Sequence, residues 1–195
     1  EWIFFLDCDE ICSTELKEKI QSALAQESPI SAYQVYRLTW YYDRFLYHGG
    51  MYPDKLFRLF KPEAIIISQK NGHPIYIPTR EHGSLEADLL HYSYESFNHQ
   101  MLKINSYATR GAISMRSEGK KGGLSKALFH SWWRFISMYF IKKGFLDGKA
   151  GFINAYHIAF YTFLKYIRVD EGNWGEPFVQ SISELPTNKP KRKKQ

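Results

Sequence analysis

The sequence is poor in cysteine and has no long uninterrupted apolar run, and each shortage excludes a class of protein. Cys8 and Cys12 are the two cysteines among 195 residues, which are too few for a disulfide scaffold and do not make a zinc site. The two most apolar helical segments, residues 124–143 and 152–167, have polar residues in their middle. Neither is therefore a typical membrane-spanning helix, which needs about 20 predominantly apolar residues.

The excess of basic charge comes mostly from the end of the chain. The chain has 26 basic and 20 acidic residues, and its last seven residues include five of the basic ones and no acid. Such a run can bind anionic lipid or nucleic acid, or can simply keep a chain end soluble. No recognisable nucleic-acid-binding fold accompanies it, so we expect no nucleic-acid partner.

Aromatic residues are abundant, at 17% of the chain, and need a core, a membrane interface or a sugar-like ligand to cover them. With 44% hydrophobic and 24% charged residues, the composition excludes intrinsic disorder for most of the length. The chain starts at Glu1, directly before an apolar run. We therefore expect it to be a piece of a longer protein.

The apolar run at residues 2–6 is typical of a strand that is buried on both faces of a parallel sheet. Hydrophobic periodicity and turn residues predict an α/β fold for residues 1–118, which would form one structural unit. Its expected helices cover residues 14–26 and 96–117, and its further strands lie within 32–47, 55–60, 64–68 and 87–92.

The composition changes after residue 118. Residues 119–123 contain three glycines and are expected to form a flexible hinge. Residues 119–168 are predicted to be an amphipathic helical hairpin, built from the two segments named above. Residues 169–195 are predicted to be a polar linker and a disordered basic tail.

Three acidic residues follow the first apolar run. Asp7 and Asp9 are two residues apart on a segment that we expect to be extended, so their side chains should point the same way. Ligands of open α/β sheets bind outside the carboxyl ends of the strands, and two convergent carboxylates suit Mg²⁺ or Mn²⁺. The segment therefore predicts a metal and phosphate site, although a polar strand end with a helix-capping acid has the same pattern.

That arrangement is compatible with two enzyme classes. In a phosphatase of the haloacid-dehalogenase type, the first aspartate is the nucleophile that accepts a phosphoryl group and the second is a general acid. Such an enzyme also uses a later pair of acidic residues for Mg²⁺, and the sequence has no Asp-Asp pair downstream. In a sugar transferase, the two carboxylates hold the metal that neutralises a nucleotide diphosphate leaving group.

Four segments, in this order, resemble the family 2 glycosyltransferases of GT-A type, close to the lipopolysaccharide-core glucosyltransferase-like group: WIFFLDCDE (2–10), HGGMYPDKLFRLF (48–60), LLHYSY (89–94) and GFLDGKAGF (144–152). The resemblance covers nearly all of residues 1–168. It implies a partial GT-A, Rossmann-like sheet with helices, followed by the hairpin. It also implies inverting, hexosyltransferase-like transfer from a nucleotide-sugar.

The resemblance also implies roles for particular residues. The metal ligands would be Asp7 and Asp9, with His91 at a strand end near the metal; a packed core histidine is the alternative for His91. The residues that line the donor and acceptor cleft would be Gly49, Gly50, Tyr52, Asp54 and Arg58.

Two departures from the family pattern bear on activity. Relatives usually have His-Glu where this chain has His73-Pro74, so the carboxylate that takes the proton of the acceptor hydroxyl is not matched. Glu81, Glu86 and Asp88 are the nearby substitutes, and we favour Asp88 or Glu81 for this catalytic role; a solvated surface acid is the alternative for each. The second departure is that relatives have a β-α-β portion before the Asp-x-Asp strand, which holds the nucleotide base. Its absence indicates that the chain is truncated at its N-terminus.

The expected hairpin has features of a membrane-surface element. Lys126, His130 and Arg134 recur every four residues and mark a narrow polar stripe on the first helix. Aromatic-rich amphipathic helices with flanking lysines, here Lys142 and Lys143, suit a membrane interface. A hairpin that caps the domain's own core is the alternative.

We therefore expect a metal-dependent glycosyltransferase that moves a sugar from a nucleotide-sugar donor to a cell-envelope glycan or lipid-linked acceptor. Mg²⁺ or Mn²⁺ would be its cofactor. It would be cytoplasmic and peripheral at the inner face of the cell membrane. The alternatives are an inactive membrane-docking remnant of such an enzyme and, third, a metal-dependent phosphatase.

Overall fold

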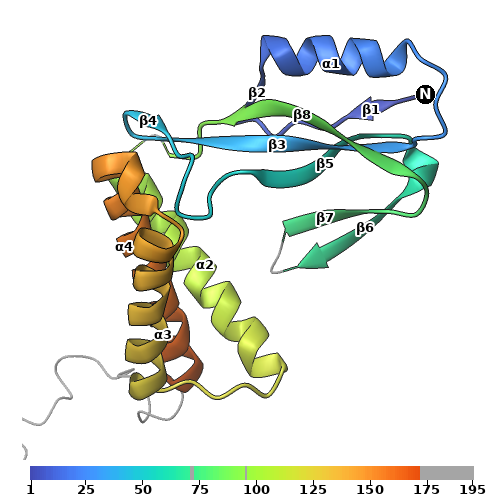
Figure 1. Cartoon of the computed structure of the whole chain (residues 1–195). Helices are drawn as coiled ribbons and strands as arrows, with labels where there is room; N and C mark the ends of the chain where they lie inside the picture. Colours follow the sequence, from blue (N-terminus) through green and yellow to red (C-terminus); the bar gives the residue numbers. More distant parts are fainter. Residues whose placement is uncertain (71–72, 95, 172–195) are drawn as a thin grey trace, which may run out of the picture.

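A curled mixed sheet is the centre of the computed structural model, which describes residues 1–70, 73–94 and 96–171 (Figure 1). The order of the strands across the sheet is β1-β5-β3-β8-β2, and β4 pairs with β3. β3 and β8 run parallel, and the other described pairs are antiparallel. The strands are β1 (Ile3–Phe4), β2 (Glu10–Cys12), β3 (Ala32–Tyr41), β4 (Arg44–Phe45), β5 (Asp54–Phe60) and β8 (His82–His91).

The first strand differs from the prediction. β1 has two residues and lies at the edge of the sheet, antiparallel to β5, with Ile3 opposite Phe60. Ile3 and Leu6 are each 42% exposed, so this strand is not buried on both faces of a parallel sheet. A short apolar run does not reveal by itself whether both faces are covered, and here helix α1 covers only one.

Helix α1 (Thr14–Leu24) packs over one face of the sheet. The side chain of Ser13 caps it by accepting a hydrogen bond from the amide of Leu16 at 3.1 Å, which satisfies one of the free amides of the first turn. Leu16 is completely buried. The core beneath the helix also contains Tyr33, Val35, Leu59, Leu85, Ala87 and Leu89.

A separate hairpin, β6 (Ile65–Lys70) and β7 (His73–Pro78), lies on the other side of the sheet from α1 (Figure 1). The short helix η1 (Pro62–Ala64) leads into it. Tyr76 stacks on Phe60 with ring centroids 5.2 Å apart, which attaches the hairpin to β5. The sequence indicated β6, whereas β7 contains two prolines and was not predicted.

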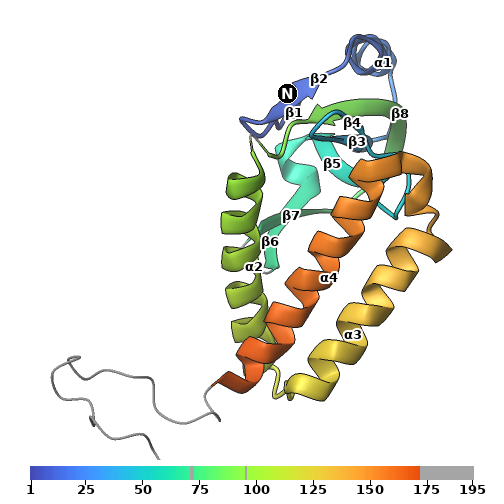
Figure 2. The same cartoon turned by 90° about the vertical axis from the view of Figure 1, so that its left-hand side faces the viewer.

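Three helices extend from one end of the sheet: α2 (Phe97–Ser117), α3 (Leu124–Ile136) and α4 (Gly148–Asp170). Both α2 and α3 pack along α4 (Figure 2). The π turn η2 (Ser137–Ile141) and the 3₁₀ turn η3 (Gly144–Asp147) connect α3 to α4. The predicted fold class, an α/β sheet followed by a helical hairpin, is confirmed; its division at residue 118 stays a prediction.

A buried polar network joins the sheet to the helices. Tyr41 at the end of β3 is within 2.8 Å of His157 Nδ1 on α4, and Gln100 Nε2 on α2 donates to the Tyr41 hydroxyl at 2.7 Å. Burial lowers the pKa of His157 below its ordinary value. The neutral imidazole can therefore accept the hydroxyl hydrogen of Tyr41.

The predicted linker and tail lie almost entirely outside the described residues, which end at 171. Of the helices within the described ranges, none combines the length and the apolar character needed to cross a bilayer.

Candidate functional site

The acidic residues after β1 lie on a turn, not on an extended segment. Residues 8–9 form the turn that leads into β2, and the amide of Glu10 donates to the carbonyl of Asp7 at 3.1 Å. The expectation that Asp7 and Asp9 point the same way along an extended strand is therefore wrong. Pairing of β2 with β8 places Glu10 opposite His91, which brings the turn to the end of β8.

Arg58 holds this turn against the sheet. Its Nη2 lies 2.6 Å from Asp7 Oδ2 and 2.6 Å from Glu10 Oε1. The Arg58 side chain is 6% exposed and that of Glu10 is 0% exposed. The Nε atom of Arg58 is buried without a hydrogen-bond partner in the described part of the chain. Removing this guanidinium would therefore leave a buried carboxylate poorly compensated.

Arg37 extends the network along β3. Its Nη2 lies 2.6 Å from Asp54 Oδ2 at the start of β5, and its Nη1 lies 3.7 Å from Glu10 Oε1. The sequence indicated Asp54 and Arg58 but missed Arg37 and Glu10 as site residues. The available signal for Arg37 was a charged residue within the aromatic-rich strand β3, and for Glu10 it was a third acidic residue directly after Asp9.

Asp9 faces a different set of partners from Asp7. Its Oδ2 lies 3.4 Å from His91 Nε2 and 3.9 Å from Lys103 Nζ on α2. Burial, followed by the positive charge of Arg37, lowers the pKa of His91 below its ordinary value. A neutral imidazole is the form that can bind a metal.

The fit of a divalent cation here depends on the carboxylates. The described residues contain no group of three or more His, Cys, Asp and Glu placed to hold a metal. Mg²⁺ is nevertheless usually bound through one or two carboxylates, with water and substrate phosphates completing its shell. Asp7 and Asp9 each use Oδ2 for the ion pairs above, and their other oxygens make no contact of this kind among the described residues. This donor set is compatible with a phosphate-bridged cation.

Asp88 and Glu81 lie elsewhere on the sheet. Strand alternation places Asp88 on the face of β8 opposite to Leu89 and His91. Asp88 Oδ1 accepts a hydrogen bond from the Tyr52 hydroxyl at 2.9 Å. Burial and this contact raise the pKa of Tyr52 to about 12. Glu81 is exposed and precedes β8 at the end remote from His91, roughly 30 Å away along the strand.

The glycine loop before β5 is attached to the helical hairpin. Gly49 and Gly50 have φ values of +68° and +75°, a region that favours glycine. The amide of Gly49 donates to the carbonyl of Lys142 at 2.8 Å. Next to it, buried Asp147 accepts a hydrogen bond from the amide of His48 at 2.8 Å and lies 2.8 Å from its Nδ1. The loop that carries Tyr52 is therefore positioned by η3.

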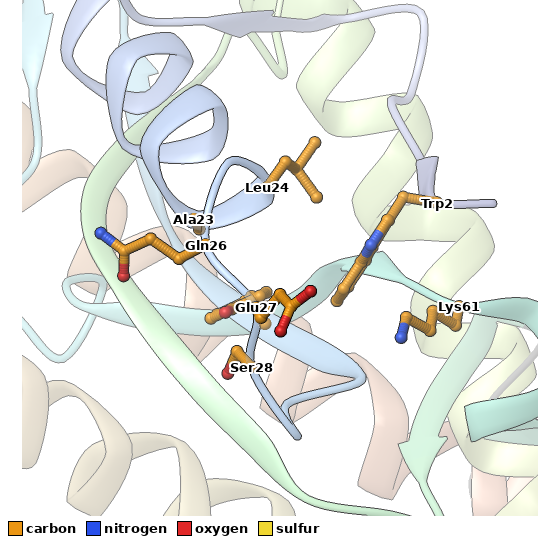
Figure 3. Close-up of a pocket in the computed structure, with 8 residues that line it drawn as sticks. Trp2, Ala23, Leu24, Gln26, Glu27, Ser28 and Lys61 are labelled. Carbon is orange, nitrogen blue, oxygen red and sulfur yellow. The ribbon is translucent and has the colours of Figure 1, made fainter.

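A cavity of about 250 Å³ lies apart from this site, beside the end of α1. Trp2, Leu24 and Lys61 are among its lining residues (Figure 3). The charged residues of the acidic turn are absent from its described lining, so the cavity adds nothing to the predicted metal site.

Comparisons with known proteins find similarity to glycosyltransferases. The chain is 26% identical over 192 residues to an uncharacterized glycosyltransferase of Rickettsia typhi, and the match covers 88% of this chain and 62% of that protein. No family model matches. The chain is thus similar to glycosyltransferases across both its sheet and its helices.

One similar protein has a more specific name. The lipopolysaccharide core biosynthesis glycosyltransferase LpsC of Rhizobium meliloti is 28% identical over 176 residues, covering 86% of this chain and 63% of LpsC. An uncharacterized glycosyltransferase of Rickettsia prowazekii is 24% identical over 186 residues. The chain spans less than two thirds of the length of these relatives.

Proposed function

We propose that this chain is part of a glycosyltransferase of GT-A type, in family 2, that moves a hexose from a nucleotide-sugar to a cell-envelope glycan or lipid-linked acceptor with inversion. The observation that carries the proposal is the similarity to LpsC and the rickettsial proteins, which covers 86% of this chain for LpsC and 88% for the Rickettsia typhi protein. An inactive membrane-docking remnant of such an enzyme is the second candidate, favoured by the large apolar side chains that the helices expose.

Asp7 and Asp9, with neutral His91 beside them, are the residues that we propose to hold Mg²⁺ or Mn²⁺. The ion, when bound, would supply charge that stabilises the leaving diphosphate. Arg58 already fixes Asp7 at 2.6 Å, and Lys103 lies 3.9 Å from Asp9. These cations keep the turn in place when no ligand is bound, and they add positive charge where the diphosphate would lie.

For the carboxylate that accepts the proton of the acceptor hydroxyl, we favour Asp88 over Glu81. Asp88 is partly buried and held by Tyr52, whereas Glu81 is exposed. Gly49 and Gly50 would support the substrate-binding role of Tyr52 by fixing its loop on the hairpin. In this proposal Tyr52 positions Asp88, and the aromatic rings around Tyr52 offer faces on which a sugar can stack.

We also propose that the protein acts at the inner face of the cell membrane. The helical layer exposes many large apolar side chains, among them Phe129, Trp132, Trp133, Phe140, Leu146 and Tyr156. Between Glu118 and Asp147 the sequence has six basic residues and no acidic one. An apolar surface with basic flanks suits an anionic bilayer, where a lipid-linked acceptor would be located.

Replacing Asp7 or Asp9 by Asn tests the function in an enzyme that spans the full length of the relatives. We expect turnover of the nucleotide-sugar to fall at least about 100-fold, a loss of roughly 3 kcal/mol of transition-state stabilisation, because each change removes a charge that faces the cation. The measurement is release of nucleoside diphosphate at increasing Mn²⁺, with Asp43→Asn, a substitution in an exposed ion pair, as the control.

Unchanged turnover in both variants would overturn the metal assignment. Absence of turnover in the unmodified full-length enzyme with UDP-, GDP- and ADP-sugars would contradict the proposed sugar transfer and favour an inactive, membrane-docking protein. Asp88→Asn distinguishes the proposed base, since it should lower turnover without changing the Mn²⁺ concentration that gives half of the maximal rate.

A further inference from the structure

A polar pocket of about 220 Å³ lies between α3 and α4, helices that Figure 2 shows side by side and away from β1 and β2. Two cations, Arg134 and Lys165, line it together with the polar or aromatic residues His130, Ser137, Thr162 and Tyr166. The polar stripe that the sequence indicated on α3 therefore turns its His130 and Arg134 toward α4.

Packing fixes these side chains in place. The stem of Lys165 crosses Gly111 of α2 so closely that a Cβ there would lie 2.9 Å from its Cδ. The Lys165 ammonium lies 5.4 Å from the ring centroid of Tyr161 and 5.6 Å from that of Tyr166. His130 stacks on Tyr166 at 4.4 Å with the planes 12° apart. The pocket is thus a preorganised site.

In the part of the chain that the structure describes, the positive charge in the pocket has no carboxylate partner. Within the described residues, neither Arg134 nor Lys165 forms an ion pair with a carboxylate. Burial lowers the pKa of Lys165, and the charges of Arg134 and Lys120 lower it further. Like charges gathered in a partly buried place are unfavourable unless an anion joins them.

We propose that this pocket binds a phosphate group. The guanidinium of Arg134 can bind phosphate through two parallel hydrogen bonds, Lys165 supplies a second charge, and the Ser137 hydroxyl lines the same space. The volume of the pocket, about 220 Å³, is several times the roughly 30 Å³ that one water molecule occupies in the liquid. The pocket can therefore hold a phosphate together with some water.

The surroundings favour a phosphate that belongs to a lipid. Trp133 lines the pocket and is 49% exposed, and Phe129, on the preceding turn of α3, is 61% exposed. The pocket thus opens beside the apolar face of the helical layer. A headgroup phosphate held by Arg134 and Lys165 would leave its acyl chains next to that face, whereas a free phosphate would use the pocket alone.

The test measures binding to the whole 195-residue chain with two probes. Inorganic phosphate is titrated by calorimetry, and phosphatidylcholine vesicles with phosphatidic acid or, at equal surface charge, phosphatidylserine are used for co-sedimentation. We expect Arg134→Gln and Lys165→Gln each to weaken binding of phosphate or of phosphatidic acid about 10-fold or more, as loss of a charged hydrogen bond does. Lys126→Gln removes the same charge from α3 outside the pocket. It should change binding of inorganic phosphate less than about 2-fold, and should weaken binding to phosphatidic acid and phosphatidylserine vesicles equally, as the loss of a surface charge does.

The pattern of losses distinguishes the outcomes. A loss confined to phosphatidic acid vesicles identifies a lipid phosphate as the ligand, and a loss with inorganic phosphate alone identifies a soluble one. If both pocket variants bind both probes as the unmodified chain does, or lose no more than Lys126→Gln, the proposal is wrong. Circular dichroism establishes that each variant folds, and Arg134→Lys should retain part of the binding. None of these measurements depends on glycosyl transfer.

Discussion

The acidic turn and the helical layer differ in how their charged and apolar side chains are placed. In the first, opposite charges are paired; in the second, like charges are gathered and apolar side chains are exposed. At the edge, Asp7, Glu10 and Arg58 neutralise one another in a partly buried network. In the helical layer, Arg134 and Lys165 share a pocket without a described carboxylate, and large apolar side chains are exposed. The first region pairs its buried charges within the chain, whereas the second has the properties of a surface that something else covers.

The largest expected effect comes from breaking the network at the edge. Arg58→Met leaves the buried Glu10 carboxylate with the Asp7 amide at 3.1 Å and with Arg37 at 3.7 Å as its one cation among the described residues, and should lower the free energy of unfolding by roughly 3–5 kcal/mol. Urea denaturation measures the change. Arg44→Met, in the exposed pair with Asp43, is the matched control and should unfold as the unmodified chain does. Equal midpoints for the two variants would show that the network does not stabilise the fold.

A smaller change in stability, but a clear change in binding, is expected from the exposed apolar face. Trp132 and Trp133 are 59% and 49% exposed, so replacing both with Ser should lower the free energy of unfolding by roughly 2–3 kcal/mol, which is less than the loss expected for Arg58→Met. Binding to anionic vesicles should nevertheless fall about 10-fold or more at both low and high salt, since apolar burial is not screened. Co-sedimentation at two salt concentrations measures this, and loss of the fold instead would make the face an internal core element.

The smallest expected change in stability comes from the buried network of Tyr41, Gln100 and His157, which links the sheet to the helical layer. Because the fold lowers the pKa of His157, the unfolded chain binds the proton more readily than the folded one. Stability contributed by neutral His157 is therefore present above about pH 6.5, the ordinary pKa of histidine, and is lost as the pH falls below it. Thermal unfolding from pH 8 to pH 5 should show this loss, with a shallower slope in His157→Gln; an unchanged slope would contradict the prediction. Some pH dependence of stability should remain in His157→Gln, because burial also lowers the pKa of His91.

The sequence predicted the bounds of the helices best, because hydrophobic periodicity and helix caps depend on residues that are close in the sequence. The bounds of α2 differ from the predicted helix by one residue at its start, and α1 begins at Thr14 as predicted. The edge position of β1 could not be read from residues 2–6, because burial of a strand depends on neighbours that are distant in the sequence. For the same reason, the resemblance named Arg58 without indicating that it binds Asp7 and Glu10.

The end of α3 shows a second limit. The predicted helix over residues 124–143 is interrupted at Ile136, where a π turn begins. Gly144 packs so closely on this turn that a Cβ would lie 2.7 Å from the carbonyl oxygen of Met138. This close contact depends on how the chain packs in three dimensions, so the spacing of apolar residues in the sequence cannot predict it. The glycines of the GFLDG segment were the visible signal, and they mark the turn between the two helices.

The hydrogen bond between the Gly49 amide and the Lys142 carbonyl has a consequence for orientation. It connects the loop before β5 with the turn at the top of the hairpin, close to where Asp147 holds His48. A tilt of the helical layer would therefore move the loop that carries Tyr52, and with it the hydrogen bond between Tyr52 and Asp88. If the layer rests on a bilayer, the height at which it settles also sets how far above the lipid the sheet holds Tyr52 and Asp88.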